Sequence, residues 1–138
     1  MKKQIITANP HTGDVINKYN YHTPEEISNI LTVSNTTFET WSQTEIPNRT
    51  KLLKNLANLL EENKEDYATL MATEMGKPIA QGIAEIEKCA VLCDFYIANA
   101  DNFLSDQIIK TEASESFISY DPLGTILAIM PWNYPFWQ

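Results

Sequence analysis

Asn133 is the side chain whose type and neighbours best suit it to chemistry. It follows Pro131 and Trp132 at the end of an apolar run that begins at Thr125. Its amide offers two N–H donors and does not titrate, which suits a preorganised contact with an oxyanion, and Trp132 offers a broad planar wall. The alternative is that Asn133 is a capping or turn amide. The bare residues leave both possibilities open.

The apolar run 125–130 predicts the strand that delivers these residues. Its β-branched and apolar side chains are typical of a strand covered on both faces, and Pro131, which has no N–H to donate, ends the ladder. Ligands bind at the carboxyl edge of such strands in open α/β sheets. We therefore expect an α/β fold. No downstream residues supply partner strands, so this fold is expected to be incomplete, as the front portion of a larger enzyme.

Four helices are expected before that strand. A turn cluster at 9–14 predicts a hairpin or extended lead-in, and Thr23-Pro24-Glu25-Glu26 carries the residues of a capping box. The second helix is expected to open at Pro47, the third to end before Gly76, and the fourth to run from about 79 to 99. Alternation over 114–120 then predicts an exposed or edge strand.

Composition limits the class of protein. The chain has 138 residues, of which 43% are hydrophobic and 20% charged, as in a soluble domain with one core. No apolar run approaches the roughly 18 residues of a membrane span, and no signal peptide core follows Lys2-Lys3, so we expect a cytoplasmic protein without a membrane partner. A net charge of −8, without clustered basic residues, makes nucleic acid an unsuitable partner.

The two cysteines give little support to a catalytic or metal role. Cys89 and Cys93 lie four residues apart on an expected helix, without nearby histidines, so a tetrahedral metal site is not expected. We interpret both as small core residues. The acidic pairs are interpreted as solvated helix surface: Glu25-Glu26, Glu61-Glu62 and Glu65-Asp66.

Several segments resemble the NAD(P)-dependent aldehyde dehydrogenases over the whole of residues 1–138. The segment 123–135, with its Pro-Trp-Asn, is similar to a motif of that family. Three others occur in the family's order: Asn-Pro-His-Thr-Gly-Asp-Val-Ile at 9–16, the Leu-rich stretch 52–60, and Glu74-Met75-Gly76-Lys77-Pro78. Residues 129–138 resemble the bacterial succinate-semialdehyde dehydrogenase branch in particular.

The resemblance implies a mechanism of which this chain holds one part. A Cys attacks the aldehyde to form a thiohemiacetal, an Asn with a backbone N–H holds its oxygen, NAD or NADP takes the hydride, and a Glu releases the acid. Asn133 matches the catalytic Asn and also borders the cofactor cleft. The matching cofactor-side residues are Ile129, Met130, Pro131 and Trp132.

The remaining parts of that mechanism are not matched. Neither cysteine matches the nucleophile, no Glu matches the base, and the four glycines have no G-x-G-x-x-G spacing, so the cofactor site is incomplete and the chain is expected to be inactive alone. The resemblance also implies that 114–122 is an arm strand of a homo-oligomer and that 125–135 is the first cofactor-domain strand and its turn. A second hypothesis is a non-catalytic module that pairs with full-length subunits.

Overall fold

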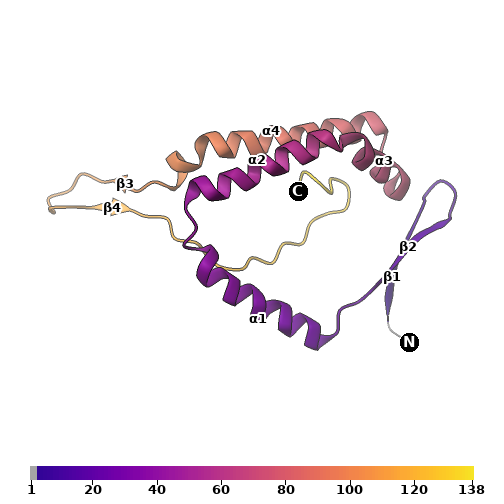
Figure 1. Ribbon diagram of the computed structural model, residues 1–138, viewed down its shortest axis with the longest axis horizontal. Helices are drawn as coiled ribbons and strands as arrows, with labels where there is room; N and C mark the ends of the chain where they lie inside the picture. Colours follow the sequence, from indigo (N-terminus) through magenta and orange to yellow (C-terminus); the bar gives the residue numbers. More distant parts are fainter. Residues whose placement is uncertain (1–2) are drawn as a thin grey trace.

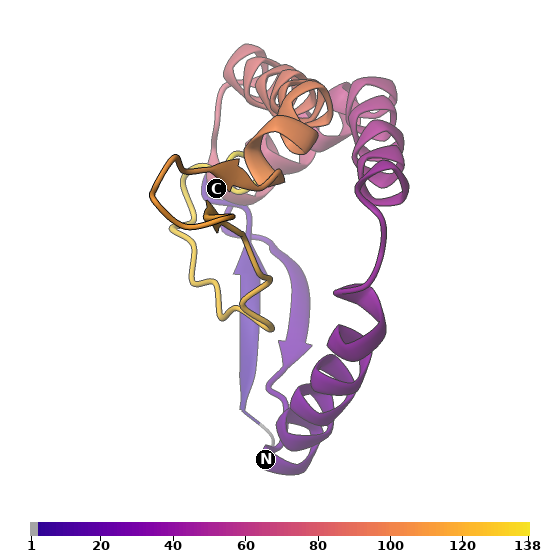
Figure 2. The same ribbon diagram turned by 90° about the vertical axis from the view of Figure 1, so that its left-hand side faces the viewer.

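The structure, a computed structural model, describes residues 3–138 of the chain (Figure 1). The elements follow in the order β1 (Gln4–Ala8), β2 (Val15–Asn20), α1 (Pro24–Trp41), α2 (Ile46–Glu62), α3 (Lys64–Met75), α4 (Ile79–Leu104), β3 (Gln107–Ile108) and β4 (Phe117–Ile118). Helices α2 and α4 lie side by side with α3 at one end of the pair, and α1 lies apart from them (Figures 1 and 2). None of the helices described at residues 3–138 is long and apolar enough to cross a membrane.

Residues 4–20 form a hairpin, one of the two predicted alternatives. Strands β1 and β2 pair antiparallel, from Gln4 opposite Asn20 to Ala8 opposite Val15. The turn between them is closed by Asn9, whose side-chain oxygen accepts the backbone N–H of His11 at 2.9 Å. Gly13 takes a φ of 80°, which side chains rarely adopt.

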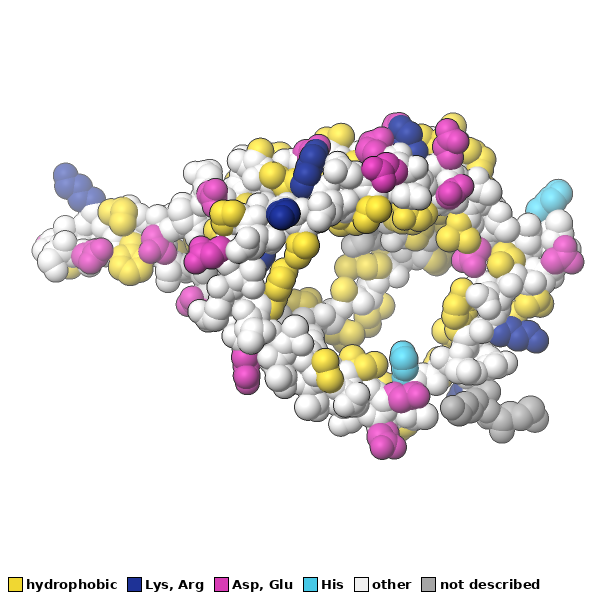
Figure 3. All heavy atoms as spheres, in the orientation of Figure 1, with side chains coloured by type: hydrophobic (Ala, Val, Ile, Leu, Met, Phe, Trp, Pro, Cys, Tyr) yellow, Lys and Arg dark blue, Asp and Glu magenta, His cyan; other side chains and the backbone are white. Residues whose placement is uncertain are grey.

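Helix α1 begins at the predicted capping box. The Thr23 hydroxyl accepts the backbone N–H of Glu26 at 3.1 Å, and the Glu26 carboxylate accepts that of Thr23 at 2.7 Å. The helix nevertheless buries none of its residues. Figure 3 shows an opening between α1 and the other helices, bordered by hydrophobic side chains. The apolar face of α1 is therefore uncovered within the described chain.

The core lies between α2, α3 and α4. Helix α3 ends, as predicted, at Gly76, which adopts the left-handed conformation with a φ of 73°. Helices α3 and α4 approach closely at Gly82, where an added Cβ would lie 2.9 Å from the Cβ of Ala68. The buried cluster comprises Ala57, Leu60, Met71, Ile86, Cys89, Ala90 and Cys93.

Helix α4 is longer than expected. It extends to Leu104, five residues past the predicted end at 99, because the sequence holds no Gly or Pro between Gly82 and Pro122 to stop it. The alternating segment 114–120 contributes only Phe117–Ile118 to a strand, which pairs with Gln107–Ile108 in a projecting arm (Figure 1).

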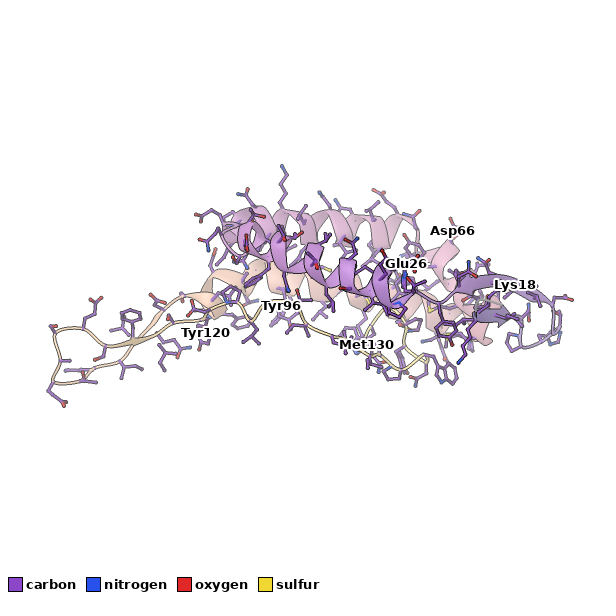
Figure 4. All side chains as sticks on the ribbon, turned by 90° about the horizontal axis from the view of Figure 1, so that it is seen from below. Lys18, Glu26, Asp66, Tyr96, Tyr120 and Met130 are labelled. Atoms are coloured by element: carbon purple, nitrogen blue, oxygen red, sulfur yellow. The ribbon has the colours of Figure 1, made fainter. Side chains whose placement is uncertain are left out.

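The prediction of a buried strand at 125–130 is wrong for the chain as described. The segment forms no strand, and Leu127 and Ile129 are 86% and 83% exposed. A strand needs a neighbour to accept and donate its backbone hydrogen bonds, and no other strand of residues 3–138 lies beside this one. Figure 4 shows Met130 on this unpaired segment and Tyr120 at the base of the arm.

Candidate functional site

The turn 132–137 is held against the start of α4, although the segment before it is unpaired. Phe136 and Trp137 are partly buried against the core of α2, α3 and α4. The Phe136 ring lies 5.1 Å from the ring of Tyr67 on α3, centroid to centroid. The unpaired segment is therefore followed by a turn that packs against helices of the same chain.

A buried ion pair makes the polar contacts that hold the turn. Lys77, between α3 and α4, pairs through its Nζ with the Glu85 carboxylate on α4, and their side chains are 7% and 2% exposed. Lys77 also donates to the backbone carbonyl of Asn133 at 3.2 Å. Glu85 Oε1 accepts the backbone N–H groups of Phe136 at 2.9 Å and Trp137 at 3.0 Å. The pair thus contacts both ends of the turn.

These contacts set the charge state of Glu85. Burial alone raises the pKa of the carboxyl, because a charged group loses its hydration. The Lys77 ammonium and the backbone N–H groups of Trp137 and Phe136 outweigh burial and hold the pKa below its ordinary value. Glu85 is therefore an ionised acceptor at neutral pH.

Two lysines also lie over aromatic rings of the turn. The Nζ of Lys77 is 4.0 Å from the centroid of the Tyr134 ring, and that of Lys88 is 3.7 Å from a ring of Trp137. Each distance lies within the range of a cation–π contact. These rings are thereby covered by the charged side chains of Lys77, which lies between α3 and α4, and of Lys88 on α4.

The predicted site residues lie on the exposed side of this arrangement. Trp132 is 75% exposed, Ile129 83% and Met130 54%, and Asn133 and Pro131 are exposed as well. The Asn133 side-chain amide has no hydrogen-bond partner within residues 3–138, whereas its backbone carbonyl is held by Lys77. A capping or turn amide would bond to its own turn, so this geometry leaves the amide available to a ligand.

Both cysteines lie in the core, as predicted. Cys89 and Cys93 are each 8% exposed on α4. Burial raises the pKa of both thiols, and the nearby carboxylates of Glu85 and Asp94 add to the shift at Cys89 and Cys93 respectively. A neutral buried thiol is a poor nucleophile. No cluster of three or more metal-binding side chains occurs at residues 3–138.

The sequence analysis missed the roles of Lys77 and Glu85. Lys77 was noted only within a motif, and Glu85 was not singled out. Glu85 lies three residues after Gly82 and four before Cys89, so all three share one face of α4. A carboxylate that lies between two buried positions on one helix face needs a compensating partner. This was the signal that the sequence offered.

Comparisons with known proteins all point to one family. A model of the aldehyde dehydrogenase family matches residues 1–138. The chain is 43% identical over 134 residues to "Probable succinate-semialdehyde dehydrogenase [NADP(+)]" of Synechocystis sp., covering 97% of this chain and 30% of that protein. It is 38% identical to "Succinate semialdehyde dehydrogenase [NAD(P)+] Sad" of Escherichia coli, over 96% of this chain and 29% of that protein.

A solved structure shows the same fold. The chain superposes with a TM-score of 0.90 and 27% identity on succinic semialdehyde dehydrogenase from Streptococcus pyogenes in complex with NADP+, covering 96% of this chain and 29% of that one. The chain therefore spans about 30% of the length of the relatives it matches. These matches confirm the resemblance stated from the sequence and the expectation of an incomplete α/β fold.

Proposed function

The chain belongs to the aldehyde dehydrogenase family, and from this premise we propose that it is the amino-terminal part of an enzyme that oxidises an aldehyde to the carboxylic acid. The observation that carries the proposal is the state of Asn133. Its backbone is held by a buried ion pair, while its side-chain amide is exposed and without a partner at residues 3–138. An amide held in this way suits a donor to the oxygen of a thiohemiacetal.

The roles of this chain in the reaction follow from its side chains. Asn133 donates to the oxygen that becomes negative when the aldehyde carbon is attacked by a thiolate, and so stabilises that charge more than the neutral carbonyl. Ile129, Met130 and Trp132 would form an apolar wall for the nicotinamide, with Pro131 ending the backbone there. NAD or NADP, when bound, accepts the hydride. The thiolate and the base come from other residues of the enzyme.

The proposed substrate is succinate semialdehyde. Its support is the similarity to two proteins that carry this substrate in their names, at 43% and 38% identity. Their names also give NADP in one case and either cofactor in the other, so NAD and NADP are both proposed. A purified full-length protein that begins with this chain should reduce one of the two cofactors with succinate semialdehyde. Activity with other aldehydes alone would overturn the substrate assignment.

We expect the 138-residue chain to be inactive by itself. Its only two cysteines are buried and their raised pKa keeps them protonated, so it offers no thiolate to attack the aldehyde. The test is the absorbance of reduced cofactor after mixing the chain with succinate semialdehyde and either nucleotide. Reduction that follows the chain through purification would contradict this expectation.

A second candidate function is a non-catalytic module that binds full-length subunits. It is favoured by the arm, which projects from the helices (Figure 1) and leaves Ile108 75% exposed and Phe117 49% exposed. In this hypothesis β3 and β4 pair with a neighbouring subunit, as the full enzyme would in a homo-oligomer. The intact mass of the native protein, together with the codons after position 138, separates the two candidates. An in-frame continuation with a later Cys supports the enzyme.

A further inference from the structure

The ion pair of Lys77 and Glu85 is unusual in where its bonds go. Both side chains are almost fully buried, and within residues 3–138 they hydrogen-bond only to each other and to the backbone of 133–137. A buried ion pair is weak evidence for stability, because desolvation of the charges offsets their attraction. The contacts with the turn therefore give the better account of why charged side chains occupy this place.

The pair holds the turn at two points. Lys77 Nζ contacts the carbonyl of Asn133, and Glu85 Oε1 accepts the N–H groups of Phe136 and Trp137. Hydrogen bonds to an ionised acceptor are shorter and stronger than neutral ones, and one oxygen here receives two of them. The backbone around Asn133 is thereby held at the Asn133 carbonyl and at the two later amides of the same turn.

The segment that precedes Asn133 in the chain does little to fix the position of Asn133. Among residues 121–132 of the described chain, the single hydrogen bond joins the hydroxyls of Thr125 and Ser34 at 2.8 Å. The helices α3 and α4, which flank the ion pair, are held more tightly, because Gly76 ends α3 in a left-handed turn and Gly82 packs α4 directly against Ala68. The position of Asn133 thus depends on the ion pair, which makes the polar contacts of the turn, together with the packing of Phe136 and Trp137 on the core.

We propose that Lys77 and Glu85 are positioning residues, which aim the Asn133 amide at the reacting oxygen by holding the backbone of its turn. Neither side chain touches the substrate. This inference rests on the proposed function, since it assigns Asn133 as the donor. Misplacement of a catalytic group by about 1 Å lowers turnover on the order of 10²-fold, so loosening the turn should act on kcat.

The test compares Glu85→Gln and Lys77→Met in a full-length protein that begins with this chain. Each variant should lower kcat with succinate semialdehyde by about tenfold to a hundredfold, while the KM of the cofactor changes little. Lys77→Arg keeps a cation beside Glu85 and should recover part of the lost kcat. Hydrogen exchange over residues 133–138 should quicken in Glu85→Gln, because two amides lose their ionised acceptor.

Lys64→Met is the matched control. Lys64 also pairs with a glutamate of α4, Glu87, at 2.6 Å, but it is 31% exposed and does not contact the turn. Its kcat and the exchange over 133–138 should equal those of the wild type. If the variants of Lys77 and Glu85 melt at lower temperature but turn over at the wild-type rate while folded, the pair is only structural and the inference is overturned.

The outcomes for the two proposals are separable. A folded wild-type protein that oxidises no aldehyde would overturn the proposed function. An active wild type whose Glu85→Gln and Lys77→Met forms match it in kcat would overturn only the positioning role. Should Glu85→Gln fail to fold, the difference in kcat between Lys77→Met and Lys77→Arg decides: equal rates at the wild-type level refute the proposal.

Discussion

Replacement of Asn133 by Ala should reduce turnover without unfolding the protein. Asn133 is exposed, and its side-chain amide has no partner within residues 3–138, so its removal leaves no polar group unpaired in the described chain. Exposed substitutions of this kind usually change the free energy of unfolding by about 0.5 kcal/mol or less. The backbone contact with Lys77 is kept, because Ala has the same carbonyl.

The kinetic effect of Asn133→Ala should be much larger than the effect on stability. Loss of one oxyanion donor raises the activation free energy by about 2.7–4 kcal/mol, or on the order of 10² to 10³ in kcat. The donor acts mainly in the transition state, so the KM of the cofactor should stay near the wild-type value.

The assay is steady-state reduction of NAD or NADP by succinate semialdehyde with the full-length protein, at several concentrations of each substrate. Thermal melting of the same samples supplies the control for folding. A variant with kcat within about twofold of the wild type, far from the roughly 10² expected of a lost donor, would refute the catalytic assignment and make Asn133 a turn residue.

Three further predictions rest on neighbouring groups. Trp132→Ala should raise the KM or Kd of the nucleotide more than it lowers kcat, measured by steady-state kinetics and nucleotide titration, because we propose that this 75% exposed side chain contacts the cofactor before and after hydride transfer. Glu85 has a lowered pKa in the folded state, so its contribution to stability is present above pH 4.5, its ordinary value, and is lost as the pH falls below it; urea unfolding of wild type and Glu85→Gln should therefore differ at neutral pH and converge in acid. Cys89 and Cys93 should react slowly with a thiol reagent in the folded 138-residue chain and quickly in denaturant, and fast labelling under native conditions would contradict their burial.

Features with local signals were predictable from the sequence. The start of α1 follows from Thr23 and Glu26, which need each other across a single turn, and the end of α3 follows from Gly76. The hairpin of β1 and β2 follows from the turn residues at 9–14. In each case the residues that decide the geometry lie within a few positions of one another, so the pattern contains the interaction.

The predicted strand at 125–130 shows what a local sequence pattern cannot predict. Its composition suits a strand covered on both faces, but composition cannot provide the neighbouring strands whose backbone groups would pair with it. Without them the same side chains lie exposed, as Leu127 does at 86%. Its place as the first strand of a cofactor domain stays a prediction for the longer protein.

The support of the candidate site was also beyond local patterns. Glu85 contacts the amides of Phe136 and Trp137 across 51 and 52 residues, and Lys77 reaches Asn133 across 56. Such a contact exists only once α3, α4 and the terminal turn have packed together. Sequence motifs identified Asn133 as a candidate donor, but not the residues that hold it.

The segment before Asn133 and the turn that contains Asn133 differ in how firmly they are held. The segment before Asn133 makes few hydrogen bonds, whereas the turn is hydrogen-bonded to side chains of α4 and of the link before α4. The buried charges of Lys77 and Glu85 are satisfied by this turn, so the turn and the pair depend on each other for their hydrogen bonds. Residues of this chain can accordingly hold the amide of Asn133 in place, as its proposed role of oxyanion donor requires.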